Sequence, residues 1–207
     1  MRKLVVICAT VLLAVAVQTQ ASIVNFDDLA TNLSFAGPSG TMKYDVIPLF
    51  YQGLQWTPNG DAGWNVNSGT TYMSAYGNSY GAASADNFAS NSGLAVATVD
   101  GTTFDFVGAD FSTWALNNAF ASFAGGYSSA TSVTVNGYNG ATLIGTVSMN
   151  LSSTGFNWLS AGFVGIDKLE ISSNSAQGYW IMDNFTTPEP ATMALLGLGA
   201  MALRRRK

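Results

Sequence analysis

The chain of 207 residues has no histidine and a single cysteine, Cys8, which lies in an apolar stretch near its start. Basic residues are also scarce between Ser22 and Thr187, where Lys43 and Lys168 are the two present. These absences exclude disulfides, thiol nucleophiles, Ser-His-Asp triads and imidazole metal sites from that segment. Most hydrolase chemistry is excluded with them.

Carboxylates dominate the charge of the same segment. Eleven Asp and Glu residues face two lysines, which gives residues 22–187 a net charge of −9, against −4 for the whole chain. Such a surface repels phosphate backbones, so we expect no nucleic-acid partner. The segment has 166 residues, which is enough for one domain with its own core.

The N-terminus has the three regions of a secretory signal. Arg2 and Lys3 precede the apolar run Leu4–Val17, and Thr19-Gln20-Ala21 follows it. We therefore predict a signal peptide over residues 1–21, cleaved after Ala21. The alternative is a retained N-terminal membrane helix, but the run is short and polar residues follow it directly.

The C-terminal twenty residues also fall into three parts: Pro188-Glu189-Pro190, the apolar run 191–203, and the basic residues 204–207. The prolines disfavour helix just before the run, so the segment that joins it to the domain should be extended and accessible to cleavage. We predict a membrane helix at about residues 190–203. The positive-inside rule places the tail 204–207 in the cytoplasm and the domain outside.

This ending closely resembles that of the bacterial PEP-CTERM proteins, whose tails are read by exosortase, a protease or transpeptidase of the inner membrane. The resemblance implies that Pro188, Glu189 and Pro190 form the processing motif, with Arg204, Arg205 and Arg206 as the basic cluster. It also implies export in a Gram-negative-type bacterium through the secretion machinery. A membrane-anchored precursor would be cleaved and then reach the cell surface or extracellular matrix. The alternative is a generic C-terminal anchor that stays attached.

Short apolar stretches interrupted by Gly and Asn predict an all-β domain over residues 22–187. The clearest strand is Thr142–Leu151, where polar residues alternate with Leu143, Gly145, Val147, Met149 and Leu151. Similar strands are predicted at 23–26, 46–56, 94–99, 104–111, 132–138, 168–172 and 179–186. A hairpin turn is predicted at Tyr138-Asn139, between Gly137 and Gly140. We expect no internal helix. The predicted fold is a two-sheet antiparallel β-sandwich, jelly-roll-like, between the signal peptide and the C-terminal apolar helix.

Residues Asn59–Gly93 are rich in Gly, Ser, Asn and Ala, and are interspersed with aromatic residues. The segment is expected to form long loops or irregular edge strands. Trp64, Tyr72, Tyr76 and Tyr80 would there offer faces that stack on sugar rings, which predicts a glycan surface. The alternative is that these side chains cover the sandwich edge or belong to strands.

Two carboxylates are expected beside apolar neighbours that share their strand phase. Asp28 shares its phase with Val24 and Phe26, and Asp183 shares its phase with Ile181 and Phe185. An inward-facing charge is costly unless it is bound or hydrogen-bonded. Asp27, Asp28 and Asp183 therefore predict a structural Ca²⁺ that ties the first strand to the last. The alternative is that backbone N–H groups or solvent satisfy these carboxylates.

A second resemblance rests on short motifs: Phe26-Asp27-Asp28-Leu29, the stretch 51–56 (YQGLQW), the stretch 108–111 (GADF) and Asp183-Asn184-Phe185. Together they look like the β-sandwich domain of many PEP-CTERM proteins, similar to jelly-roll carbohydrate-binding modules with a structural Ca²⁺. The resemblance implies the fold, and it implies a calcium ion and a glycan ligand less directly.

The expected function is that of an exported, non-catalytic protein of the cell surface or exopolysaccharide matrix, for example of a biofilm, that binds extracellular polysaccharide. One alternative is a structural or adhesive coat protein without a defined ligand. The other is an enzyme acting on polysaccharide, which would need an acid and a base at a defined separation. Asp167 and Glu170 do not fit that need, because strand phase points them to opposite faces.

Overall fold

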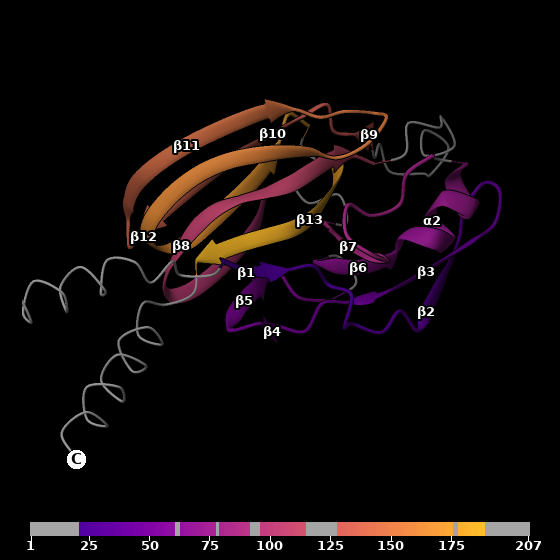
Figure 1. Ribbon diagram of the computed structural model, residues 1–207, viewed down its shortest axis with the longest axis horizontal. Helices are drawn as coiled ribbons and strands as arrows, with labels where there is room; N and C mark the ends of the chain where they lie inside the picture. Colours follow the sequence, from indigo (N-terminus) through magenta and orange to yellow (C-terminus); the bar gives the residue numbers. More distant parts are fainter. Residues whose placement is uncertain are drawn as a thin grey trace, which may run out of the picture.

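The computed structural model describes residues 21–60, 63–77, 79–91, 96–114, 128–175 and 178–188. This part of the chain consists of strands and one short helix, α2 (Figure 1). The strand pairs are antiparallel, apart from a parallel pairing of β9 with β13. The predicted all-β class is therefore confirmed, and the prediction of no internal helix is wrong.

The first half of the fold holds β1 (Ala21–Val24), β2 (Leu33–Ala36), β3 (Thr41–Val46), β4 (Phe50–Tyr51), β5 (Leu54–Thr57), β6 (Asn65–Ser68), α2 (Gly69–Tyr76) and β7 (Asn87–Ser90). The second half holds β8 (Val96–Thr113), β9 (Ser128–Ser129), β10 (Ser132–Asn139), β11 (Thr142–Asn150), β12 (Asn157–Ser173) and β13 (Gly178–Pro188).

One continuous sheet curls over on itself to make two facing layers. Its main path runs β11-β10-β12-β8-β13-β7-β6-β3-β2. The start of β8 pairs with β5, its end pairs with β13, and β12 follows it along both parts. The long strands β8 and β12 therefore belong to both layers, as their curvature in Figure 1 shows. A sandwich-like arrangement thus arises from one hydrogen-bonded path, where two separate sheets were predicted.

Glycines allow the bend in β12. The register of β12 against β8 shifts after Ser160 and again after Phe163, and the positive φ angles of Gly162 (64°) and Gly165 (67°) lie in these interruptions. Such β-bulges kink a strand without ending it. The strand predicted over 168–172 therefore corresponds to the last part of β12, and the earlier part of β12 was not predicted.

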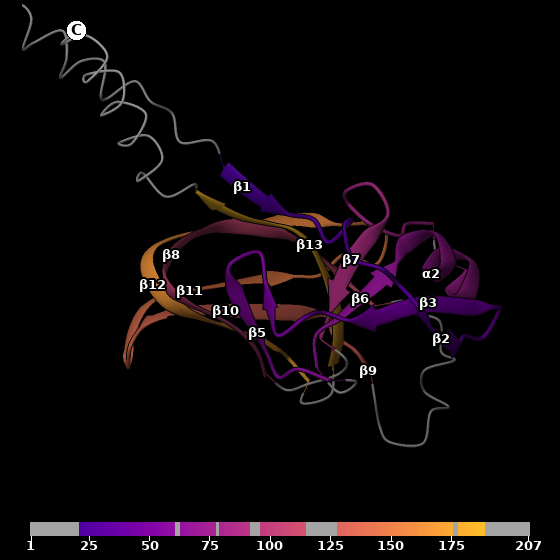
Figure 2. The same cartoon turned by 90° about the horizontal axis from the view of Figure 1, so that it is seen from below.

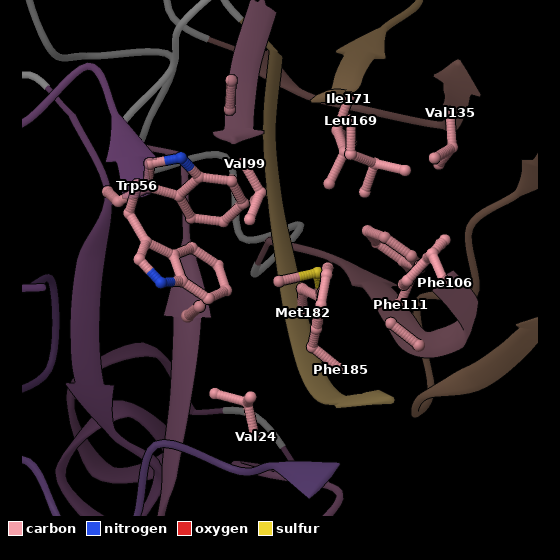
Figure 3. Close-up of a cluster of buried hydrophobic side chains, with 14 of the residues drawn as sticks. Val24, Trp56, Val99, Phe106, Phe111, Val135, Leu169, Ile171, Met182 and Phe185 are labelled. Atoms are coloured by element: carbon pink, nitrogen blue, oxygen red, sulfur yellow. The ribbon is translucent and has the colours of Figure 1, made fainter. Parts of the chain in front are cut away.

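The core fills the space between the two layers. Val135, Leu169 and Ile171 from one layer belong to the same buried cluster as Phe111 and Met182 from the other (Figure 3). A row of indole rings crosses this core: Trp64 packs edge-on against Trp56 at a centroid distance of 5.0 Å and against Trp180 at 5.4 Å.

Helix α2 covers a second, smaller core on the other face of the sheet. The buried residues of this cluster are Met42, Tyr72, Ala75, Tyr76, Phe88, Trp114 and Ile181. Ser68 caps the N-terminus by accepting a hydrogen bond from Thr71 N, and Gly77 ends the helix in the left-handed conformation. Gly69 and two threonines give the segment a weak helix propensity, and packing of Tyr72, Ala75 and Tyr76 outweighs it.

The segment predicted as one strand over 46–56 is broken by a tight turn. Gln52 and Gly53 have φ angles of 52° and 77°, and they connect β4 to β5 as a two-residue hairpin loop. Val46 ends the earlier strand β3.

Strand β11 confirms the clearest sequence prediction, with one local change. Gly140-Ala141 forms the turn of the β10–β11 hairpin, two residues later than predicted, because Asn139 pairs with Thr142. The register shifts after Gly137, and Leu143 then pairs with Tyr138. Opposite residues share a face, so Leu143 lies on the outer face with Tyr138 and is 53 % exposed.

Candidate functional site

Asp183 is completely buried in β13 and is held by backbone donors. Its Oδ2 accepts hydrogen bonds from Ala83 N at 2.9 Å and Ser84 N at 2.7 Å, and its Oδ1 accepts one from Asn184 N at 2.7 Å. Burial outweighs these donors and raises the pKa of the carboxyl to about 6. Asp183 thus ties the last strand to the loop that precedes β7.

The predicted common phase of Ile181, Asp183 and Phe185 is partly correct. All three are buried, but Asn184 has a φ of 50° and the pairing of β13 with β8 shifts between Asp183 and Thr186. Ile181 consequently packs in the cluster under α2, whereas Phe185 packs in the main core.

Asp27 fixes the same loop from the N-terminal side. Its Oδ1 accepts hydrogen bonds from Asp86 N at 2.9 Å and Asn87 N at 2.8 Å. Partial burial alone would raise the pKa of this carboxyl, but the backbone hydrogen bonds from Asn87 and Asp86 outweigh it and lower the pKa. The loop between α2 and β7 is therefore clamped by two aspartates that come from opposite ends of the domain sequence.

Asp28 points away from the core, because Phe26 has a positive φ of 62° that breaks the strand alternation. Its Oδ1 accepts a hydrogen bond from the Tyr51 hydroxyl, and Gln52 Nε2 approaches its Oδ2 at 3.4 Å. Burial, reinforced by the neighbouring carboxylate of Asp28, raises the pKa of the Tyr51 phenol above its usual range.

The predicted calcium ligands Asp27, Asp28 and Asp183 do not form one site. Within the described residues, no group of three or more Asp, Glu, Cys or His side chains is placed to hold a metal ion. Each carboxylate instead accepts hydrogen bonds, as given above. The alternative expectation, capping by backbone N–H groups, holds for Asp27 and Asp183. We therefore assign no calcium to this set.

The four aromatic residues predicted to bind glycan are mostly core residues, which corrects that prediction. Trp64, Tyr72 and Tyr76 have no exposed surface, and Trp64 Nε1 donates to Thr98 O at 2.9 Å. Tyr80 is partly buried, and its hydroxyl donates to Thr113 O at 3.1 Å. A ring enclosed by protein cannot stack on a sugar. The alternative, that these side chains cover the sandwich edge or belong to strands, is also inexact, because Tyr72 and Tyr76 lie in α2 and none of the four lies in a strand.

A set of polar side chains lies on the outer face of the layer formed by β10, β12 and β8. We call it the polar face, and its residues are Asn136, Tyr138, Lys168, Glu170, Thr98 and Asp100. The register arranges them in two rows across the three strands: one runs from Tyr138 through Lys168 to Asp100, and the other from Asn136 through Glu170 to Thr98. Sequence alternation predicts the outward direction of such residues, but not which strands become neighbours.

Glu170 links the charges of the polar face. Lys168 Nζ donates to Glu170 Oε1 at 2.9 Å and lies over the Tyr138 ring, 4.6 Å from its centroid. Hydrogen bonding to Glu170 raises the pKa of both the Lys168 ammonium and the Tyr138 phenol. On the neighbouring strand, Thr98 Oγ1 donates to Asp100 Oδ2 at 3.3 Å.

The start of the predicted processing motif lies at the end of the sheet. β1 pairs antiparallel with the end of β13, and Ala21 is opposite Pro188 (Figure 2). The predicted signal-peptide cleavage site after Ala21 and the first residue of the motif therefore lie side by side. The sheet ends at Pro188, directly before Glu189.

Several sequence predictions lie outside the described residues: the signal peptide before Ala21, Glu189, Pro190, Arg204, Arg205, Arg206, and the helix at about 190–203 with its tail 204–207. Among the residues that the structure describes, no helix has the length and apolar character needed to cross a membrane.

Residues 186–207 match the family model described as the PEP-CTERM protein-sorting motif. The match covers the predicted motif and tail and begins within β13. A search of curated proteins found no match for the chain.

Proposed function

We propose that this chain, an exported protein that its PEP-CTERM sorting signal addresses to exosortase, is a non-catalytic component of the cell surface or of the extracellular polysaccharide matrix. The polar face is its contact with polysaccharide. In this proposal the polar face binds the polysaccharide, in place of the aromatic residues of segment 59–93 that the sequence pattern had predicted to do so.

The proposal rests on the polar face, because its side chains can form hydrogen bonds with the many hydroxyl groups of a polysaccharide. Asn136 and Thr98 both donate and accept hydrogen bonds, Glu170 and Asp100 accept, and Lys168 donates. Tyr138 adds a ring beside them. Strands lie about 4.8 Å apart, so the two rows present a repeating set of donors and acceptors to an extended chain.

Charge favours a neutral polysaccharide over an anionic one. Lys168 is one of the two basic residues in segment 22–187 and is already paired with Glu170. A net charge of −9 on that segment opposes the approach of polyanions. The ligand class is therefore a neutral, hydroxyl-rich polymer.

Replacement of Tyr138 by alanine tests the polar face. We expect Tyr138→Ala to weaken binding to neutral exopolysaccharide isolated from the producing cells by about tenfold, because it removes both the ring and the phenol. The measurement is a sedimentation pull-down of the purified protein with the insoluble polymer.

Trp158→Ala is the matched control, because Trp158 is an aromatic residue, 45 % exposed, that pairs with Asp110 in the other layer. It should bind like the wild type. Equal binding by Tyr138→Ala and the wild type would contradict a role for the polar face, and no saturable binding by the wild type would favour a coat protein without a ligand.

Processing at the sorting motif has a separate test. We expect Glu189→Ala to leave the full precursor in the membrane fraction, because the substitution removes the carboxylate from the motif while Pro188 still ends β13. Cell fractionation and mass spectrometry of the C-terminus measure this. Normal release of a shortened chain from the variant would show that Glu189 is dispensable.

A further inference from the structure

One long stretch of the chain carries no charge. No Asp, Glu, Lys or Arg occurs from Phe111 to Ile166, a span of 56 residues, although segment 22–187 is strongly acidic as a whole. Strands β10 and β11 and the first part of β12 all lie within it.

Strand β11 is an edge of the sheet within this uncharged stretch. It begins the strand order and pairs only with β10 among the described strands. Natural edge strands commonly carry lysine, proline or a bulge that blocks further pairing. The bulge of this hairpin lies at Ile144, before the regular part Gly145–Asn150, and that part contains no charge and no proline.

The main core also reaches this edge. Val147 and Met149 pack against the buried cluster but stay only partly buried. On the outer face, Thr146 Oγ1 donates to Asn136 Oδ1 at 2.8 Å, and the Ser148 hydroxyl shares a hydrogen bond of 2.9 Å with Thr134. These two hydrogen bonds tie β11 to β10, and the partly buried side chains of Val147 and Met149 lie beside the free edge.

We propose that β11 is a self-association edge, at which β11 of one copy pairs antiparallel with β11 of a second copy. The pairing continues the β10–β11 ladder across a two-fold axis and satisfies the outer backbone groups of both strands. Registers that keep the two inner faces together place Val147 and Met149 beside the same residues of the second copy.

The charge pattern favours a second copy of this chain as the partner of β11. Two domains of net charge −9 repel one another through most of their surfaces, but two uncharged strands meet without like charges opposite each other. The β11 edge is therefore where two copies can approach most closely.

Cross-linking through a single cysteine tests the pairing. The segment 22–187 has no cysteine, so Ser148→Cys introduces the one thiol of that segment, on the outer face of β11, and the Ser172→Cys control shares Cys8 with it. The full precursor is produced in exporting cells, which are then treated with a short bis-maleimide. We expect a covalent dimer, because the two introduced thiols lie within reach of a short linker in the registers that place Val147 and Met149 beside the same residues of the second copy.

Ser172→Cys is the matched control, since Ser172 is also an outward serine but lies on β12, two strands from the edge. Two such thiols would be about 20 Å farther apart across the same interface. A dimer yield from Ser148→Cys no higher than that from Ser172→Cys would overturn the proposal.

A second measurement needs no cysteine. In sedimentation of the purified processed protein we expect wild-type dimers that form with rising concentration, and Ser148→Lys should weaken their association by about tenfold, whereas Ser172→Lys should not. A wild type that stays a single copy at every concentration, or equal effects of both lysines, would overturn the proposal. Sedimentation of the purified protein includes no polysaccharide, so its result does not depend on the polar face.

Discussion

Trp64→Ala is expected to lower the free energy of unfolding by about 3–5 kcal/mol, the range for truncation of a buried tryptophan. Trp64 is completely buried between Trp56 and Trp180, and its indole N–H donates to Thr98 O. Truncation leaves a large cavity in the main core and an unpaired carbonyl. Because small domains have a total stability of about 5–15 kcal/mol, the loss should be visible as a much lower urea midpoint.

Trp158→Ala is again the control, because its indole is 45 % exposed and its loss should cost under about 1 kcal/mol. Urea unfolding of both variants, followed by circular dichroism, makes the comparison. Equal midpoints for Trp64→Ala and Trp158→Ala would show that Trp64 is not a core residue. The same pair separates folding from ligand binding, since a sugar-stacking tryptophan would affect binding without affecting the midpoint.

The free energy of unfolding is expected to fall as the pH rises from about 4 to above 6, by about 3 kcal/mol from Asp183 alone. The folded-state pKa of Asp183 is about 6, against 3.8 for an ordinary, solvent-exposed aspartate. In that window the folded protein holds a proton that the unfolded chain has lost. The stabilisation is present below the unfolded pKa and is lost as the pH passes through the folded pKa.

Asp27 acts in the opposite direction at lower pH. Its folded pKa lies below 3.8, so its contribution is present above the unfolded pKa and is lost as the pH falls further. The joint contribution of the two carboxylates that clamp one loop is therefore largest near the unfolded pKa, at about pH 4.

Urea unfolding over a pH series, compared among the wild type, Asp183→Asn and Asp27→Asn, tests both signs. Asp183→Asn should remove the fall between about pH 4 and pH 6, and Asp27→Asn should leave that fall intact while reducing the loss at lower pH. A wild type whose stability rises through this window, or an Asp183→Asn variant with an unchanged profile, would contradict the assignment.

Strand alternation made much of the fold predictable. β10 and β11 lie close to the ranges expected from Val-Thr and Val-Ser alternation, because each has one face on the core. β13 also lies close to its predicted range, although both of its faces are buried. The sorting motif was predictable for a different reason: its residues act as a linear signal, and their order along the chain is sufficient to identify them.

Other features depend on contacts between distant residues. Helix α2 has a recognisable N-cap in Ser68 and left-handed Gly77 after its last turn, but its weak helix formers hide it unless the packing of Tyr72 and Tyr76 is known. Trp64 looked like a surface aromatic because its neighbours in sequence are polar, yet they lie in the fully buried strand β6. Local composition reports the sequence neighbours of a residue, whereas burial depends on its neighbours in space.

The curled sheet was not predictable from the same patterns. Alternation restarts on each side of Gly162 and Gly165, so one bent strand resembles a short strand preceded by a loop. The polar face follows from that bend, because only the pairing of β8 with β12 brings Asp100 beside Lys168. A sequence pattern predicts the face of the strand on which a side chain lies, whereas the strand order of the sheet determines which residues lie next to it.

The position of β13 has a consequence for the timing of folding. This last strand in the sequence is an inner strand: β8 flanks one side, and β7 and β1 flank the other. Neither core can close until residues 178–188 are present, because Trp180, Ile181 and Phe185 supply parts of both. Folding of the domain therefore waits for the end of its sequence, where β13 overlaps the sorting motif at residues 186–207.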